Sequence, residues 1–214
     1  MVDGSLTANG GVYGGSADGC GSGSGGGIYV TCQTFGGAAS GLLSVKGGDN
    51  TGARGGAGGG GRIAVDYETL APGNAVRFNA QSGSGYYTQP RRAAAPGTLW
   101  LATRDLLQAG TIGDGRFMGV CFHAPGFDAW TVDELVVTNG AVILAADGFT
   151  LNVQGDLTVG DGGLLGIGAV SGDAHPALNC DGSLRVRDGG CLLVFGGRTN
   201  SAAKAVGAEV TVAG

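Results

Sequence analysis

Cys121 and His123 are the residues with the clearest capacity for chemistry, because a thiol nucleophile needs a nearby proton acceptor. Two residues apart on one strand, the two side chains would share a face. They lie in residues 104–133, which interrupt the repeats described below, and long connections often carry function. A linker in which Phe122 and Trp130 cover an edge of the core explains the segment better, so we assign no catalytic residue.

Asp161 and Asp188 form a second candidate group, since each stands before glycine in one of two similar stretches. If the stretches stack, the two carboxylates could do acid–base work or bind Ca²⁺. Asp before Gly at repeated corners is also what turn formation alone predicts. The calcium-binding nonapeptide GGxGxDxUx is missing from the sequence. We therefore expect no cofactor and no metal, with calcium as the alternative.

Trp100 and Trp130 are candidate contacts for a glycan. Trp100 stands between Leu99 and Leu101 at an outward strand position, where its ring could stack on a sugar or be covered by another element. Trp130 could likewise stack on a sugar, and the alternative is that it covers the edge of a core.

The five cysteines are Cys20, Cys32, Cys121, Cys180 and Cys191. None belongs to a C-x-x-C pair, which argues against a structural zinc site. Because their number is odd, at least one is free or pairs with another chain. Cys20 and Cys32 bracket one glycine-rich stretch and could form a disulfide in an oxidising compartment.

Glycine dominates the composition, with 48 of 214 residues, about three times the usual share of ~7%. Apolar runs between the glycine tracts favour a folded chain over a disordered one. The net charge is -5 and the basic residues are scattered, which argues against nucleic-acid binding. No apolar run approaches the length of about 18 residues that a membrane-spanning helix needs.

The second half of the chain repeats itself at a spacing of 27 residues. GDLTVGDGGLL (155–165) corresponds to GSLRVRDGGCLL (182–193), so that Leu157 falls on Leu184 and Asp161 on Asp188. An earlier copy lies 22 residues upstream, with Leu135, Val137, Asn139, Gly140 and Ile143 matching Leu157, Val159, Asp161, Gly162 and Leu165. A later copy begins at AEVTV (208–212), which we align with SLRV.

The first half repeats at a longer spacing. GGGIYV (25–30), GGGRIAV (59–65) and PGTLWLA (96–102) recur at 35 and 36 residues. The stretches SLTANGG, LLSVKGG and RFNAQSG recur at about the same spacing. Each unit thus contains a short strand, a glycine-rich excursion and a second short strand.

Apolar residues alternate within each copy, which is the period of a strand with one buried face. No segment has a sustained helical period with caps. Between strands, Asp or Asn followed by Gly tolerates left-handed backbone and makes turns. The sequence therefore predicts an all-β fold with a corner ladder of Asn139, Gly140, Asp161, Gly162, Asp188 and Gly189.

The stretches GGGGRIAVDY, GSGSGGGIYVTC and LTVGDGGLL resemble the glycine-rich right-handed parallel β-helix regions of large secreted bacterial surface proteins and, more loosely, the pectin-lyase-like superfamily. The resemblance implies a β-solenoid in which 1–103 carries repeats of about 36 residues with Gly-rich excursions, 104–133 is a non-repeating connector, and 134–214 carries repeats of 22–27 residues. Neither chain end reads as a polar cap, so we expect the repeats to continue beyond the chain end.

The resemblance implies a structural role in an extracellular or cell-surface stalk, fibre or adhesin. The expected partners are neighbouring repeats, further copies of the chain or glycans, with no nucleic acid. One alternative is a polysaccharide-active enzyme, for which Asp161, Asp188, Arg185 and Arg187 are the residues to test, because lyases of this fold combine clustered Asp and Ca²⁺ with a basic residue. Another alternative is a carbohydrate-binding module.

Overall fold

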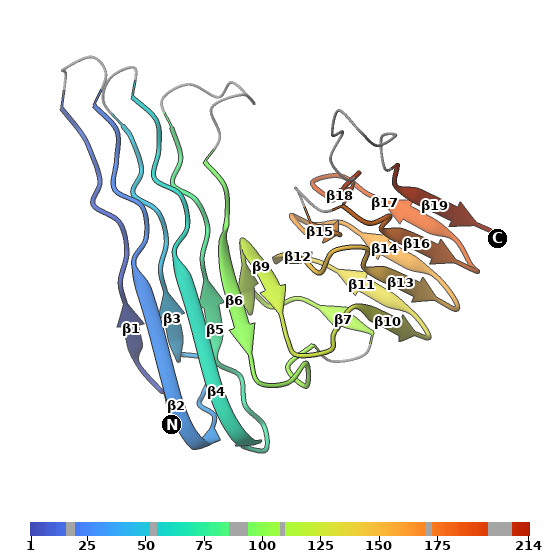
Figure 1. Ribbon diagram of the computed structural model, residues 1–214, viewed down its shortest axis with the longest axis horizontal. Helices are drawn as coiled ribbons and strands as arrows, with labels where there is room; N and C mark the ends of the chain where they lie inside the picture. The colour runs from blue at the N-terminus through green and yellow to red at the C-terminus, as the bar shows by residue number, and fades with distance from the viewer. Residues whose placement is uncertain (16–19, 52–54, 86–93, 108–109, 170–172, 197–206) are drawn as a thin grey trace. The chain divides into compact units, whose positions relative to one another are not determined.

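The computed structural model describes residues 1–15, 20–51, 55–85, 94–107, 110–169, 173–196 and 207–214, and these residues form an all-β structure (Figure 1). Strands are the regular elements of the described chain, and no helix occurs there. The described residues accordingly contain no helix long and apolar enough to cross a membrane. The predicted all-β class is confirmed, with parallel pairing between repeats.

The chain divides into two compact units. The first unit comprises Met1–Ala102 and Arg116–Cys121, and the second comprises Thr103–Gly115 and Phe122–Gly214. The strands of the first unit are β1 Ser5–Thr7, β2 Gly27–Phe35, β3 Leu42–Ser44, β4 Arg62–Leu70, β5 Arg77–Asn79, β6 Gly97–Leu101 and β8 Phe117–Met118.

The strands of the second unit are β7 Thr111–Ile112, β10 Ala129–Val132, β11 Leu135–Val137, β12 Ala141–Leu144, β13 Thr150–Val153, β14 Leu157–Val159, β15 Leu164–Ile167, β16 Ala177–Cys180, β17 Leu184–Val186, β18 Cys191–Val194 and β19 Glu209–Val212. The residues of β9, Val120–His123, divide between the two units.

In the first unit the strands join two parallel sheets. One sheet has the order β1-β3-β5-β8, and the other places β2, β4 and β6 side by side. Ile28 pairs with Ile63, which pairs with Leu99, so the predicted spacings of 35 and 36 residues are confirmed. The inward side chains of both sheets form a core in which the ring centroids of Phe78 and Phe117 lie 6.0 Å apart.

Glycine-rich segments continue the strands of the first unit and bond to one another in two directions. The backbone N–H groups of Ser22 and Gly25 donate to the next repeat, to the carbonyls of Gly56 and Gly59, at 3.0 and 2.9 Å. Gly23 and Gly26 donate instead to the segment that follows β1, at 2.9 and 2.7 Å. Donors that share a direction are three residues apart, which is the period of the polyproline II helix and not of a strand.

The glycines of these segments are required by close approach of backbones. A Cβ atom added to Gly25 would lie 1.8 Å from the carbonyl oxygen of Val45, and one added to Gly47 would lie 2.1 Å from that of Gly58. Neither glycine has φ in the left-handed region, so backbone conformation does not explain them. The glycine-rich excursions therefore form a hydrogen-bonded bundle in which backbone packs directly on backbone.

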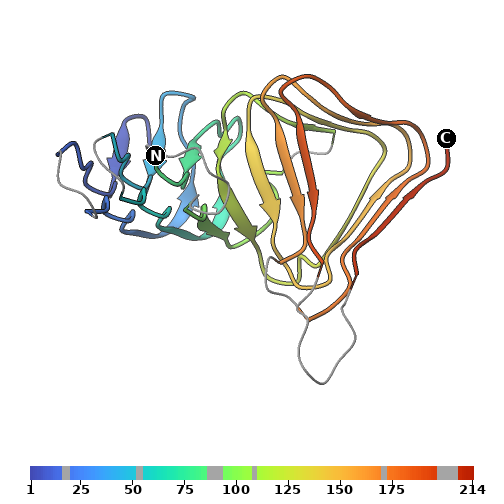
Figure 2. The same ribbon diagram turned by 90° about the horizontal axis from the view of Figure 1, so that it is seen from above.

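In the second unit the strands of successive repeats lie next to one another, as the yellow to red segments of Figure 2 show. The sheets are β7-β11-β14-β17, β10-β13-β16-β19, and β12-β15-β18 with β9 beside β12. Leu157 pairs with Leu184, and Leu151 pairs with Leu178. The predicted spacing of 27 residues is confirmed at these positions.

Equivalent apolar side chains stack into columns inside the second unit. Leu135, Leu157, Val137 and Val159 are all fully buried, as are Leu151 and Leu178. Burial of one such Leu or Val side chain stabilises the folded state by about 1.5–3 kcal/mol. Each column thus depends on a side chain from every repeat.

Two of the predicted alignments are wrong. Leu165 pairs with Val142 and not with Ile143, because the Asn139 corner is one residue shorter than the Asp161 corner. The final strand β19 pairs with β16 and not with β17. Apolar residues alternate in the same way in both candidate partners, with Leu178 and Cys180 in β16 and Leu184 and Val186 in β17, so the pattern by itself could not distinguish them.

The segment 104–133 is not the non-repeating connector that the sequence predicts. Its strands β7 and β10 pair with β11 and β13, and β9 lies beside β12. Ile112 and Val132 are buried in line with the columns. The segment therefore supplies strands to the repeats, although its turns and aromatic residues hide the repeat in the sequence.

Candidate functional site

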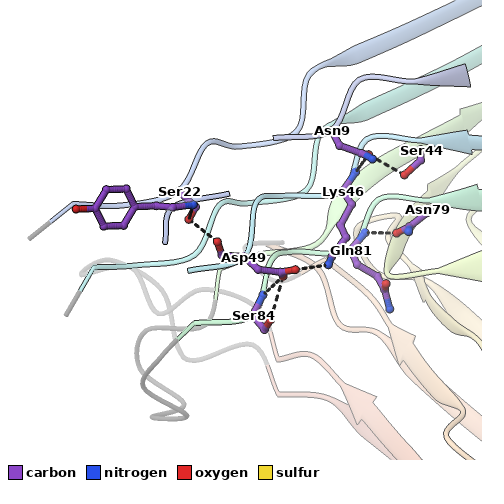
Figure 3. A network of polar contacts seen from close by, with 9 residues as sticks. Asn9, Ser22, Ser44, Lys46, Asp49, Asn79, Gln81 and Ser84 are labelled. Atoms are coloured by element: carbon purple, nitrogen blue, oxygen red, sulfur yellow. Dashed lines mark hydrogen bonds and ion pairs between the residues drawn. The ribbon is translucent and has the colours of Figure 1, made fainter. Parts of the chain in front are cut away.

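Asp49 is the centre of a polar network on the glycine-rich bundle (Figure 3). Its Oδ2 accepts a hydrogen bond from Lys46 Nζ at 2.8 Å, and its Oδ1 accepts from the backbone N and the Oγ of Ser84 at 2.8 and 2.9 Å. Ser22 Oγ donates to the backbone carbonyl of Asp49 at 2.8 Å and accepts from the backbone N of Tyr13 at 3.0 Å. The network thus links three successive repeats.

Short polar side chains extend this network toward the strand ends. Asn9 Oδ1 accepts from Ser44 Oγ at 2.7 Å and from the backbone N of Lys46 at 2.8 Å. In the next repeat, Asn79 Oδ1 accepts from the backbone N of Gln81 at 3.1 Å. These side chains satisfy backbone donors that the glycine bundle leaves at its surface.

The electrostatics of Asp49 agree with a structural role. Its hydrogen bond from Lys46, followed by those from Ser84, lowers its pKa from 3.8 to about 2. A carboxylate with so low a pKa is ionised throughout the neutral range and makes a poor general acid or base. The arrangement ties repeats together and contains no activated nucleophile.

The predicted corner ladder is partly formed in the second unit. Asn139 and Asp161 both have left-handed backbone, with φ of 43° and 49°, and the N–H of Asn139 donates to the carbonyl of Asp161 at 3.0 Å. Gly162 and Gly189 also have positive φ, of 74° and 71°. Asp188 accepts through its carbonyl from Asp161 N at 3.2 Å without a left-handed backbone.

Sequence reasoning missed the first member of this ladder. Asp114 and Gly115 have φ of 58° and 64°, and Gly115 N donates to the carbonyl of Asn139 at 2.8 Å. The dipeptide Asp-Gly was the available signal, and the assumption that 104–133 is a connector concealed it. Gly140 completes the Asn139 corner and is buried.

Two carboxylates bridge neighbouring repeats through backbone donors. Asp147 accepts from the N–H groups of Asp173 and Ala174, both at 3.0 Å, and these bonds lower its pKa. Asp156 forms an ion pair with Arg185, which lowers its pKa, and it accepts from Ser183 N at 2.8 Å. Both side chains act as clamps between one repeat and the next.

The residues proposed for polysaccharide cleavage are only partly brought together, because Asp161 and Asp188 lie in adjacent corners whereas Arg185 bonds to another carboxylate. Arg185 is engaged by Asp156, not by Asp161 or Asp188. Arg187 lies with its Cβ 3.1 Å from the position that a Cβ on Gly160 would occupy. Among the residues that the structure describes, no three His, Cys, Asp or Glu side chains lie close enough together to hold a metal ion.

Cys121 and His123 share one face of β9, as expected from their spacing, because Val120 and Phe122 are buried on the other. Burial raises the pKa of the Cys121 thiol and lowers the pKa of the His123 imidazole. A thiol with a raised pKa is protonated at neutral pH and is therefore a weak nucleophile. The two side chains therefore share a face, but their surroundings do not favour the ionised form of the thiol.

The two tryptophans occupy different environments. Trp130 is wrong as a glycan contact, because it is only 4% exposed and pairs with the core residue Leu151. Its ring centroid lies 6.2 Å from that of Phe127, so it is a core residue. Trp100 lies at a partly exposed, outward position between buried Leu99 and Leu101, as the sequence predicts.

Cys20 and Cys32 are not brought together. Both are free thiols, and the chain between them runs extended from the bundle into β2. Twelve residue steps of extended chain span roughly 35 Å, whereas a disulfide needs Cα atoms within about 7 Å. The predicted disulfide does not fit this arrangement.

The last described repeat leaves core positions uncovered. Val210 and Val212 are 50% and 43% exposed, although they pair with the buried residues Leu178 and Cys180. Val186 is 52% exposed and pairs with fully buried Val159. Strands β17, β18 and β19 thus present apolar side chains and an unpaired edge.

Comparison with protein-family models, curated proteins and solved structures gives no match to this chain. The function therefore has to follow from the geometry of its own residues.

Proposed function

We propose that this chain is a structural segment of an extracellular or cell-surface protein, in which a right-handed parallel β-helix serves as a stalk, fibre or adhesin shaft. The observation that carries the proposal is that the carboxylates which could take part in catalysis are engaged in hydrogen bonds between repeats. Asp49, Asp147 and Asp156 all bond to a neighbouring repeat. These carboxylates hold the repeats in register, and their oxygens are already engaged as hydrogen-bond acceptors.

The parallel pairing of successive repeats supports the β-helix. A connection between parallel strands of one sheet is right-handed in almost all proteins, because a right-twisted strand packs back on its sheet only in that sense. Stacked repeats contact mainly their neighbours, so length can grow without a change in cross-section. The surface location is proposed from the resemblance to glycine-rich regions of secreted surface proteins.

Cell fractionation tests the structural role. Intact source cells are treated with a protease, and released peptides are identified by mass spectrometry. We expect peptides of this chain in the released fraction and in the envelope fraction. Recovery only from the soluble cytosol, with none released from intact cells, would overturn the proposed location and with it the role in a surface stalk.

The exposed apolar side chains of the last described repeat support a further parallel strand beside β19, supplied by a following repeat or, in self-association, by a second copy of the chain. Because β19 offers unpaired backbone groups and exposed Val210, a second parallel strand would satisfy both. Sedimentation velocity at increasing concentration is expected to show association of the wild type and its loss in V210K/V212K. T131K, which adds one lysine to the same sheet away from this edge, is the control.

A monomeric wild type at every concentration would remove self-association from the proposal. Equal association of the wild type and V210K/V212K would place the contact elsewhere on the chain.

A further inference from the structure

Tyr29, Ala64 and Trp100 form one straight row across β2, β4 and β6. Tyr29 pairs with Ala64, and Ala64 pairs with Trp100. All three side chains are outward, because the residues before and after each of them in its strand point toward the core. Tyr29 is 70% exposed, and Trp100 is partly exposed. Two aromatic side chains therefore flank one small residue on an open sheet face.

The spacing of this row suits alternate rings of a sugar chain. Neighbouring strands lie about 4.8 Å apart, so the two aromatic positions are separated by about 10 Å. That separation is close to the length of a disaccharide unit in an extended β-1,4-linked glycan. In such a glycan every second ring presents the same face, so each aromatic would meet an equivalent ring while the ring between them passes over Ala64.

The chemistry of the contact is stacking. The C–H bonds on the face of a pyranose ring are apolar and carry partial positive charge, whereas the face of an aromatic ring is negative. Gly27 and Thr31 flank Tyr29, Thr98 lies beside Trp100, and the charged residues Arg62 and Asp66 flank Ala64 in the middle of the row. They leave both rings accessible from above and offer hydrogen-bonding groups for hydroxyls.

The charge of the surface selects among glycans. Asp66 and Glu68 lie on the outward face of β4, beyond Ala64, with Arg62 on the other side. The chain as a whole has a net charge of -5. Because two carboxylates outnumber the one guanidinium on this face and the chain is acidic, an acidic polysaccharide is disfavoured, and a curved α-linked glucan would not follow a row of paired residues.

We propose that Tyr29 and Trp100 bind a neutral, linear, β-1,4-linked polysaccharide that crosses the strands over Ala64. This binding is separate from the structural role, because loss of glycan affinity would leave surface location and assembly unchanged. A single exposed aromatic residue needs no explanation. Two aromatic residues in register on one face, at the spacing of alternate sugar rings, are explained by binding of a glycan.

Tryptophan fluorescence and calorimetry test the site on the full chain. In the W130F background, Trp100 is the emitting tryptophan, and its emission is expected to shift on titration with cellohexaose or N-acetylchitohexaose. Calorimetry on Y29A and W100A is expected to show about tenfold weaker binding, as expected for the loss of one stacking contact. A64L keeps both rings and blocks the space between them, and is expected to weaken binding similarly.

Several results would overturn the proposal. These are no binding of any neutral β-linked hexasaccharide by the wild type, unchanged affinity in both Y29A and W100A, or preference for maltohexaose or oligogalacturonate. V12A, which removes an exposed apolar side chain from the same unit, is the matched control and should bind like the wild type. Circular dichroism of each variant should match the wild type before its affinity is compared.

Discussion

The two units stack their repeats by different means. In the second unit, neighbouring repeats meet through columns of Leu and Val side chains such as Leu135 and Leu157. In the glycine-rich part of the first unit, the neighbours are backbones, and Gly25 lies where any Cβ would strike a carbonyl oxygen. A side-chain core is damaged by removal of atoms, whereas a backbone bundle is damaged by their addition.

The comparison can be measured because each unit has its own tryptophan. Trp100 belongs to the first unit, and Trp130 belongs to the second. W130F and W100F therefore give two backgrounds in which urea unfolding of one unit is followed by fluorescence. Transitions at different urea concentrations would mean that the units unfold separately, and a single ΔG would then not describe the chain.

The largest expected effect is in the second unit. Leu157→Ala removes a fully buried side chain from its column and is expected to lower the free energy of unfolding by about 3 kcal/mol, because it leaves a cavity. Thr158→Ala changes the neighbouring outward residue and should cost less than about 0.5 kcal/mol. Urea unfolding in the W100F background measures both. Similar losses for the two variants would contradict a side-chain column.

The next largest effect is expected in the first unit, where adding an atom, and not removing one, should destabilise the fold. Gly25→Ala adds a methyl group whose carbon would lie 1.8 Å from the carbonyl oxygen of Val45, and it is expected to cost about 2–3 kcal/mol, because the backbones must separate. Gly56→Ala is the matched control, since a Cβ there meets nothing within 4 Å. Unfolding is followed in the W130F background. If both variants are equally stable, close backbone packing is not what requires Gly25.

A corner residue should show a smaller effect that depends on backbone conformation. Asp161→Ala places alanine at φ of 49° and is expected to cost about 1–2 kcal/mol. Asp161→Gly should be close to neutral, because glycine adopts this conformation freely. Asp188→Ala provides the comparison, since Asp188 does not have a left-handed backbone. A cost at Asp188 as large as at Asp161 would argue against the conformational explanation.

The smallest effect is the pH dependence of the Asp49 network. Its folded-state pKa of about 2 lies below the ordinary value of 3.8, so its contribution is complete above about pH 4 and is lost between pH 4 and pH 2. Because the side chain is partly exposed, we expect about 1 kcal/mol. Acid unfolding of the wild type and Asp49→Asn should differ near neutral pH and converge toward pH 2. A constant difference would exclude Asp49 as its source.

Much of the repeat architecture was predictable from particular residues. The pairing of Leu157 with Leu184 and of Ile28 with Ile63 follows from spacing, because identical positions must stack to continue a buried column. The Asn139 and Asp161 corners follow from the preference of Asn and Asp for left-handed backbone. The partner of β19 did not follow, since β16 and β17 offer the same alternation.

The candidate sites were less predictable, since they depend on what lies opposite a side chain. Asp49 stands in a glycine-rich stretch with no motif, and its partner Ser84 is 35 residues away. Trp130 is of a residue type that often contacts glycans, but its strand pairs with the strand of Leu151 and its side chain is buried. The row that contains Tyr29 needed the register of three strands before its spacing could be recognised.

The sequence by itself determined the all-β class, the repeat lengths and the corner positions, because these depend on local periodicity and on which residues tolerate a turn. The tertiary structure alone decided that the glycines pack backbone against backbone, that 104–133 joins the repeats, and that Cys20 and Cys32 lie far apart. The physical reason is that contacts between repeats depend on which backbones and side chains come to face each other. A periodic pattern records which residue is buried, but not what it is buried against.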